Sequence, residues 1–92
     1  MHWVISYDIV DDKRRAQLAH TLESWGLRVQ YSVFECQLSP QERKHLALQL
    51  QEYIDPEEDS LRWYPICNHC LAKASHLGKG TTPGEGRDYF LI

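Results

Sequence analysis

The sequence opens with the run HWVISYDI (residues 2–9), which VDDKRR (residues 10–15) follows directly. Aromatic and β-branched residues dominate the first run, so it predicts a β-strand that ends at Asp8. A carboxylate at the end of a strand is held on a rigid base. Asp8 is therefore the first candidate for a functional side chain.

The second run predicts the start of a helix that Asp11 or Asp12 caps. Its first turn holds Lys13, Arg14 and Arg15, although an exposed cation there opposes the helix macrodipole by about 0.3–1 kcal/mol. Cations and free backbone N–H groups can bind the phosphates of a nucleic acid, and a carboxylate beside them can hold a metal ion against those phosphates. The alternative is a solvated turn in which the two aspartates neutralise the basic run.

The bulk composition indicates one domain over residues 1–92. A chain of this size buries only roughly 60–65% of its unfolded surface, so a partner subunit would add a useful buried face. No stretch is long and apolar enough for a membrane span, and the N-terminus lacks the pattern of a signal peptide, so we expect a cytoplasmic protein with no membrane partner. With a net charge of −3, nucleic-acid binding would need a local basic face.

A helix over residues 12–25 is predicted from apolar residues at helical spacing. Leu18, Leu22 and Trp25 form this stripe, and Gly26 follows as the residue that ends the helix. The stripe should lie on a sheet, with Trp25 as a core residue.

Residues 27–38 alternate as a strand, and the pattern fits either one long strand or two short ones. The run SPQE (residues 39–42) is a capping box with proline at the first helical position, which predicts the start of a second helix. We expect the apolar face of this helix to consist of Leu46, Leu50, Tyr53 and Ile54.

The C-terminal third predicts a strand, an arm and a second strand. Residues 60–67 have strand character, and Pro65 favours an edge strand or a bulge. Residues 75–88 contain four glycines and read as a flexible arm. The apolar residues 89–92 after this arm predict a strand that pairs with the edge of a sheet, either in its own subunit or in a partner.

Two blocks of the sequence resemble the signature blocks of a CRISPR-associated protein family. The blocks are YDIVDDKRR (residues 7–15) and RVQYSVFEC (residues 28–36). Shorter likenesses at DSLR (residues 59–62), YP (64–65) and YFLI (89–92) extend over essentially the whole chain. The family, Cas-two, is the second core protein of the spacer-acquisition machinery.

The resemblance implies an α+β fold of the ferredoxin-like βαββαβ type, in which residues 27–38 form a hairpin and both helices cover one face of the sheet. It also implies a homodimer through the other face, with residues 89–92 crossing to extend the partner's sheet. Family members are described as metal-dependent endonucleases that act on RNA or DNA. They also serve as non-catalytic bridges for the CRISPR integrase, the first core protein of the machinery.

The resemblance also implies a metal site at Asp8. Gln17 stands where some members have a further arginine, which weakens any groove built there. Together with the basic run, the positions that carry over predict nucleic-acid contacts at Arg14, Arg15, Arg28 and Phe34.

The chemistry of Asp8 agrees with this resemblance. If a two-fold axis passes near the end of the first strand, two Asp8 carboxylates face each other and need a proton or a cation between them. Mg²⁺ fits, because it binds through one or two carboxylates, keeps several waters and pairs with phosphates. The expected cofactor is therefore Mg²⁺, with Mn²⁺ as the alternative. Asp11 and Asp12 compete for this role but are better used as helix caps.

The run CNHC (residues 67–70) with His76 raises the possibility of a zinc site. A structural zinc site needs four ligands at set spacing, and the sequence offers only scattered candidates. Two reduced thiols at a strand end are the favoured interpretation. Three cysteines in a chain without an export signal do not predict a disulfide framework.

Three functions therefore compete: a magnesium-dependent endonuclease, a DNA-binding scaffold of the same system, and a small-molecule regulatory module suggested by the fold alone. The fold does not decide among them. The third predicts a ligand pocket, and the sequence contains no glycine-rich loop of a ligand-binding type.

Overall fold

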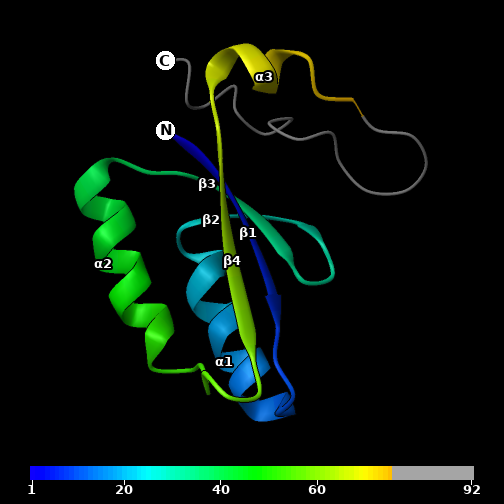
Figure 1. Ribbon diagram of the computed structural model, residues 1–92, viewed down its shortest axis with the longest axis vertical. Coiled ribbons are helices and arrows are strands. Elements are labelled where there is room, and N and C mark those ends of the chain that lie inside the picture. The colour runs from blue at the N-terminus through cyan, green and yellow to red at the C-terminus, as the bar shows by residue number, and fades with distance from the viewer. Residues whose placement is uncertain (76–92) are drawn as a thin grey trace.

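The computed structural model describes residues 1–75, which form a four-stranded sheet and three helices (Figure 1). The sheet has the strand order β2-β3-β1-β4, and the paired strands are antiparallel. This is the ferredoxin-like βαββαβ arrangement that the sequence predicted. The elements in chain order are β1 (His2–Asp8), α1 (Asp12–Glu23), β2 (Gly26–Gln30), β3 (Val33–Gln37), α2 (Pro40–Gln51), β4 (Ser60–Ile66) and α3 (Asn68–Ala72).

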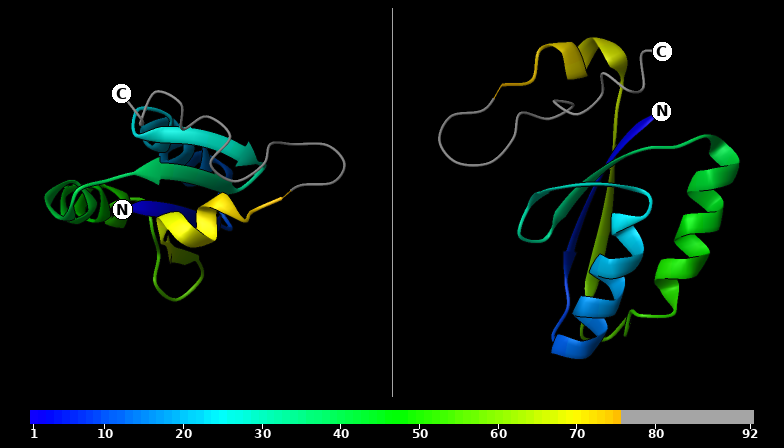
Figure 2. Two further views of the ribbon diagram at one scale, coloured as in Figure 1. Left: turned by 90° about the horizontal axis from the view of Figure 1, so that it is seen from above. Right: turned by 180° about the vertical axis from the view of Figure 1, so that it is seen from behind.

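Helices α1 and α2 lie on the same face of the sheet, as predicted (Figure 2). Their apolar stripes meet the inward side chains of β1 and β3 in one core. Burial of this apolar surface is the main stabilising term of so small a domain. The core consists of Ile5, Tyr7, Ile9, Leu18, Ala19, Leu22, Phe34, Cys36, Leu38, Leu46 and Leu50.

The register of β1 decides which side chains the helices cover. Ile5 and Tyr7 are buried beneath the helices. The residues of β1 that alternate with them therefore lie on the opposite, open face of the sheet. Asp8 ends the strand on this open face, where it pairs with Ser60 of β4. The open face is apolar in part, since Tyr64 of β4 is 46% exposed beside Val4.

Helix α1 is shorter than predicted. It ends at Glu23 with Ser24 as the cap, so Gly26 is not the residue that ends the helix but the first residue of β2. A glycine is needed there because a Cβ atom would lie 2.6 Å from the Cys36 sulfur and closer still to the Glu35 carbonyl oxygen. Gly26 therefore allows β2 to lie close to β3.

Residues 27–38 form a hairpin, which settles the choice between one strand and two. Strands β2 and β3 pair with an irregularity between Arg28 and Gln30. Pro65 lies in the edge strand β4, as predicted. The capping box also forms: the side chain of Ser39 accepts a hydrogen bond from the Glu42 backbone N–H, and Glu42 accepts one from the Ser39 N–H.

The second helix also ends earlier than its apolar pattern suggests. Tyr53 and Ile54 lie in the turn after α2, although both still pack on the core. Helix α3 after β4 was not predicted. The predicted terminal strand (residues 89–92) and nearly all of the predicted arm lie outside the described residues. None of the helices in residues 1–75 is long and apolar enough to cross a membrane.

Candidate functional site

The carboxylate of Asp8 is exposed at the C-terminal end of β1. Within residues 1–75 it has no hydrogen bond or ion pair, so its oxygens are available to a ligand. The same part of the chain contains no group of three acidic, histidine or cysteine side chains that could hold a metal ion. A metal at Asp8 would therefore need further ligands from a second copy, from water or from a phosphate.

Arg14 is held by carboxylates and serves the structure of the β1–α1 connection. Its guanidinium pairs with Asp59 at 2.5 Å and approaches Glu58 at 3.7 Å, while its backbone N–H binds the capping carboxylate of Asp11 at 2.9 Å. The Asp59 side chain is fully inaccessible to solvent. Of the predicted phosphate-binding cations, Arg14 is thus the one that pairs with a buried carboxylate.

Asp59 ties three segments of the chain together. Besides Arg14, it accepts hydrogen bonds from the backbone N–H groups of Val10 at 2.9 Å and Asp55 at 2.8 Å. Burial opposes ionisation of Asp59, but these N–H groups and the Arg14 guanidinium outweigh it and lower the pKa of the carboxyl group. This role of Asp59 depends on contacts with residues far away in the sequence, which no local pattern shows.

Arg15 lies beside the end of β1 on the other face of the sheet. Its guanidinium donates to the Ile9 carbonyl oxygen at 2.9 Å and pairs with Asp12 in the first turn of α1. The hydrogen bond that Arg15 donates to Asp12 raises the pKa of the Arg15 guanidinium, so the cation stays charged. About a third of the side chain is exposed, which leaves it open to an anion.

Arg28 projects from β2 on the helix-covered face, opposite Phe34 in the strand register. Its guanidinium lies 5.2 Å from the centre of the Phe34 ring and donates to the Tyr7 hydroxyl at 3.3 Å. The Tyr7 hydroxyl in turn donates to the Tyr31 carbonyl oxygen at 3.4 Å. A cation over an aromatic ring is held in place while its remaining donors stay free.

The prediction for Phe34 is wrong. This residue was predicted to contact nucleic acid, but its side chain has no exposed surface and belongs to the core. It stacks on Tyr7 and supports Arg28 from beneath, so its contribution to a binding site is indirect. Alternation along a strand shows that Phe34 and its neighbours lie on opposite faces of the sheet, but it does not show which face the helices cover.

Arg15 and Arg28 meet in one pocket of about 280 Å³ between α1 and the β2–β3 hairpin. Tyr31, whose side chain is 82% exposed, stands at the tip of the hairpin and lines the same pocket. Two cations, a hydroxyl and an exposed aromatic ring are the groups that bind a phosphate and the ring of a base. Tyr7, Tyr31 and Asp12 were not predicted as members of this site, although Tyr7 and Tyr31 belong to the two resembling blocks.

The structure places Asp8 and this basic pocket at the same end of β1 but on opposite faces of the sheet. Neighbouring side chains of a strand alternate between faces, so Asp8 is on the open face while Tyr7 points toward the helices. One copy of residues 1–75 therefore does not bring the candidate metal ligand and the basic pocket onto one surface.

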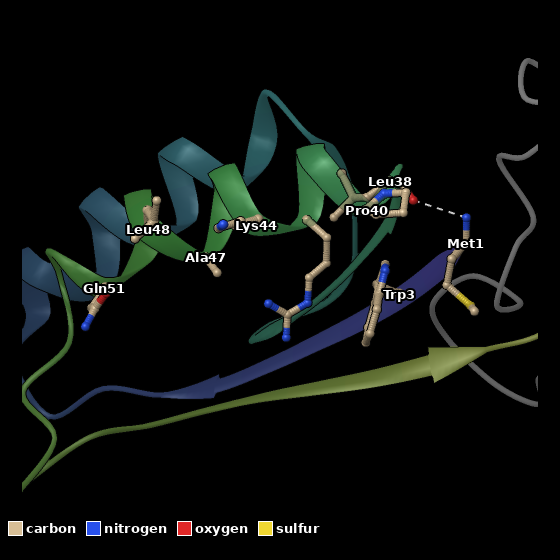
Figure 3. Close-up of a pocket in the computed structure, with 9 residues that line it drawn as sticks. Met1, Trp3, Leu38, Pro40, Lys44, Ala47, Leu48 and Gln51 are labelled. Carbon is tan, nitrogen blue, oxygen red and sulfur yellow. Dashed lines mark hydrogen bonds between the residues drawn. The ribbon is translucent and has the colours of Figure 1, made fainter.

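A larger groove of about 460 Å³ lies at the other end of β1, between this strand and α2 (Figure 3). Its lining is mainly apolar and includes Trp3, Leu48 and Met1, whose amino group donates to the Leu38 carbonyl oxygen at 3.1 Å. The guanidinium of Arg43 lies 3.9 Å from the centre of the Trp63 ring, so this cation is already engaged. The described residues that line the groove include no acidic, histidine or cysteine side chain that could act in catalysis.

Comparison with known proteins decides the family. The family model described as CRISPR associated protein Cas2 matches residues 1–74. The chain belongs to the Cas2 family. A relative from Synechocystis, named CRISPR-associated endoribonuclease Cas2, is 48% identical over 77 residues, which are 84% of each chain.

Solved Cas2 structures share this fold. The crystal structure of Streptococcus pyogenes Cas2 covers 85% of this chain and 100% of its own, with a TM-score of 0.76 at 31% identity. A chain from a structure titled a partial Cas6-RT-Cas1–Cas2 complex covers 82% of this chain and 87% of its own, with a TM-score of 0.72 at 35% identity. The sequence resemblance to the family is thereby confirmed.

Proposed function

We propose that this Cas2 protein is a magnesium-dependent endonuclease that cleaves phosphodiester bonds of RNA or DNA in the acquisition of CRISPR spacers. The observation that carries the proposal is the carboxylate of Asp8, which is exposed at the end of the central strand β1 and has no hydrogen bond or ion pair within residues 1–75. The names of the relatives, CRISPR-associated endoribonuclease Cas2, support a nuclease activity of this kind.

Asp8 fits a hard cation in a homodimer. One carboxylate from each of two copies, placed across a two-fold axis, provides the small set of oxygen ligands that Mg²⁺ takes from a protein while it keeps water and phosphate ligands. Mn²⁺ has similar preferences. A bound Mg²⁺ would supply an activated water and neutralise charge on the scissile phosphate.

The chain's own residues bind and orient the substrate. Arg15 and Arg28 place two cations in one pocket, where phosphate oxygens would replace water as their partners. The Tyr7 hydroxyl orients Arg28, and the exposed Tyr31 ring gives a base a surface for stacking. If both arginines bind phosphate oxygens and not base edges, binding should depend weakly on the nucleotide sequence.

The test compares wild-type protein with Asp8→Asn and, as a matched control, Asp11→Asn, which changes an exposed carboxylate of the helix cap. Labelled RNA and duplex DNA are incubated with Mg²⁺, Mn²⁺, Ca²⁺ or a chelator. We expect cleavage only with Mg²⁺ or Mn²⁺, its loss in Asp8→Asn with an unchanged circular dichroism spectrum, and retention in Asp11→Asn. Ca²⁺ should support binding with slow cleavage or none, because its looser coordination orients water and phosphate less strictly.

A second function has its own support, namely a non-catalytic, DNA-binding dimer that bridges the CRISPR integrase during spacer integration. The structure titled a Cas1–Cas2 complex contains a chain that resembles this one over most of its length. If wild-type protein cleaves nothing under any metal tried, yet Asp8→Asn still assembles with the integrase and supports spacer uptake, this scaffold function replaces the nuclease. Cleavage that persists in a chelator would also overturn the metal assignment.

A further inference from the structure

Two exposed cysteines, Cys67 and Cys70, lie where β4 leads into α3 and take no part in the proposed site. The Cys67 sulfur accepts a hydrogen bond from the Cys70 backbone N–H at 3.4 Å. The two thiols also lie near enough for each to shift the pKa of the other. One turn of the chain therefore holds two accessible thiols close together.

The environment makes the two thiols chemically different. The backbone and side-chain hydrogen bonds from Cys70 lower the pKa of Cys67, whereas the interaction with Cys67 raises the pKa of Cys70. A lowered pKa and exposure make Cys67 the attacking thiol, with Cys70 beside it to complete the exchange. The third cysteine, Cys36, is buried in the core, and this burial raises its pKa to about 12.

We propose that Cys67 and Cys70 form a reversible dithiol–disulfide pair that reacts with low-molecular-weight disulfides. The Cys67 thiolate attacks one sulfur of the small disulfide, forms a mixed disulfide and releases one small thiolate. Cys70 then loses its proton and attacks the Cys67 sulfur, which expels the second small thiolate. Two protein thiols are oxidised to one disulfide while the small disulfide is reduced to two thiols, so that atoms and electrons balance.

The place of this pair in the fold gives the reaction a structural consequence. Cys67 caps α3 directly after the edge strand β4, and Cys70 lies within the helix. A disulfide would close residues 67–70 into a covalent ring and fix the direction in which the chain leaves the sheet. The pair is therefore a redox-sensitive modification site, independent of Asp8 and of the basic pocket.

The test is mass spectrometry of the intact protein. Fully reduced full-length protein is incubated with oxidised glutathione, denatured and treated with iodoacetamide, which labels each remaining thiol. We expect one iodoacetamide label on the three cysteines of the wild-type protein and no bound glutathione. Apart from the label, the protein should weigh about 2 Da less than the reduced form, because the disulfide forms with loss of two hydrogens. Cys70→Ser should instead accumulate a stable glutathione adduct on Cys67, because no second thiol completes the exchange.

Two further variants serve as controls. Cys67→Ser should react more slowly than Cys70→Ser, because only the Cys67 sulfur accepts the backbone N–H hydrogen bond that stabilises a thiolate, and Cys70→Ser keeps this bond. Cys36→Ser should form the disulfide at the wild-type rate. The proposal is overturned if wild-type protein keeps a glutathione adduct or forms disulfides between chains, or if Cys67→Ser and Cys70→Ser react equally fast while both keep the wild-type circular dichroism spectrum.

Discussion

Arg14 and Asp59, which lie 45 residues apart in the chain, form a 2.5 Å ion pair that joins the start of α1 to the loop before β4. The carboxylate of this pair is inaccessible to solvent, and it also binds two backbone N–H groups. Removal of one partner would leave the other groups without theirs, which costs more than the pair contributes as a whole. The pair therefore holds together both loops at the end of β1 where Asp8 lies.

We predict that Asp59→Asn lowers the melting temperature by more than about 5 °C, a shift typical of a lost buried interaction in a domain of this size. Glu58→Gln is the matched control, because Glu58 is exposed and only approaches Arg14 at 3.7 Å. Thermal unfolding followed by circular dichroism measures both variants. Equal melting temperatures for the two would contradict the structural role of Asp59.

The same carboxylate predicts a pH dependence. The pKa of Asp59 in the folded protein lies below the unfolded value of 3.8. Its contribution to stability is therefore complete above about pH 4 and is lost as the pH falls through the lower, folded-state pKa. Urea unfolding between pH 6 and about pH 3 should show a smaller loss of stability in Asp59→Asn than in the wild type.

Gly26→Ala should destabilise the protein by roughly 1–3 kcal/mol, the usual cost of forcing an extra methyl group into a filled space. The new Cβ atom would press on the Cys36 sulfur and the Glu35 backbone, so that β2 and β3 must separate. Urea denaturation gives the free energy of unfolding. Gln30→Ala, an exposed change in the same strand, should cost little, and a tolerated Gly26→Ala would mean that the two strands can move apart freely.

Arg15→Gln and Arg28→Gln should each weaken nucleic-acid binding by roughly 3–10-fold, about equally for different sequences, and should reduce the salt dependence by about one phosphate contact. Lys44→Gln removes the same charge at the distant apolar groove and should have little effect. Fluorescence anisotropy at several salt concentrations measures these changes. A strong sequence preference that disappears with one arginine would argue for base readout instead.

Asp12→Asn should leave the fold and any cleavage nearly unchanged but tighten nucleic-acid binding, by up to about 5-fold. The reason is that Asp12 neutralises Arg15, and an exposed ion pair of this kind is worth about 0.2–1 kcal/mol. The same anisotropy measurement compares the affinity of Asp12→Asn with that of the wild type. Weaker binding in Asp12→Asn would show that Asp12 positions Arg15 for the phosphate.

The proposed homodimer predicts different effects for two exposed apolar residues. Tyr64→Lys, on the open face of the sheet, should shift the protein toward the monomer, because a cation would be buried in the interface. Leu48→Lys, on the far side of the molecule at the helical groove, should leave the dimer intact. Sedimentation velocity over a range of concentrations distinguishes the two outcomes. A dimer lost only in Leu48→Lys would place the interface on the helices.

The sequence by itself determined the features that depend on neighbouring residues. The capping box at Ser39 fixes the start of α2 because its donors and acceptors lie within one turn. The β-branched and aromatic run before Asp8 predicts both β1 and the place where it ends, and Pro65 predicts an edge strand because it cannot donate a hydrogen bond to the sheet.

Only the tertiary structure decided which groups are free to act. Alternation shows that Phe34 and its neighbours face opposite sides, but not which side the helices cover, so Phe34 proved to be core. Likewise, three adjacent cations look equivalent in sequence, yet Arg14 is neutralised by Asp59 while Arg15 lines a pocket with Arg28. Burial and long-range ion pairing depend on segments far apart in the chain, and it is the packing of the fold that brings those segments together.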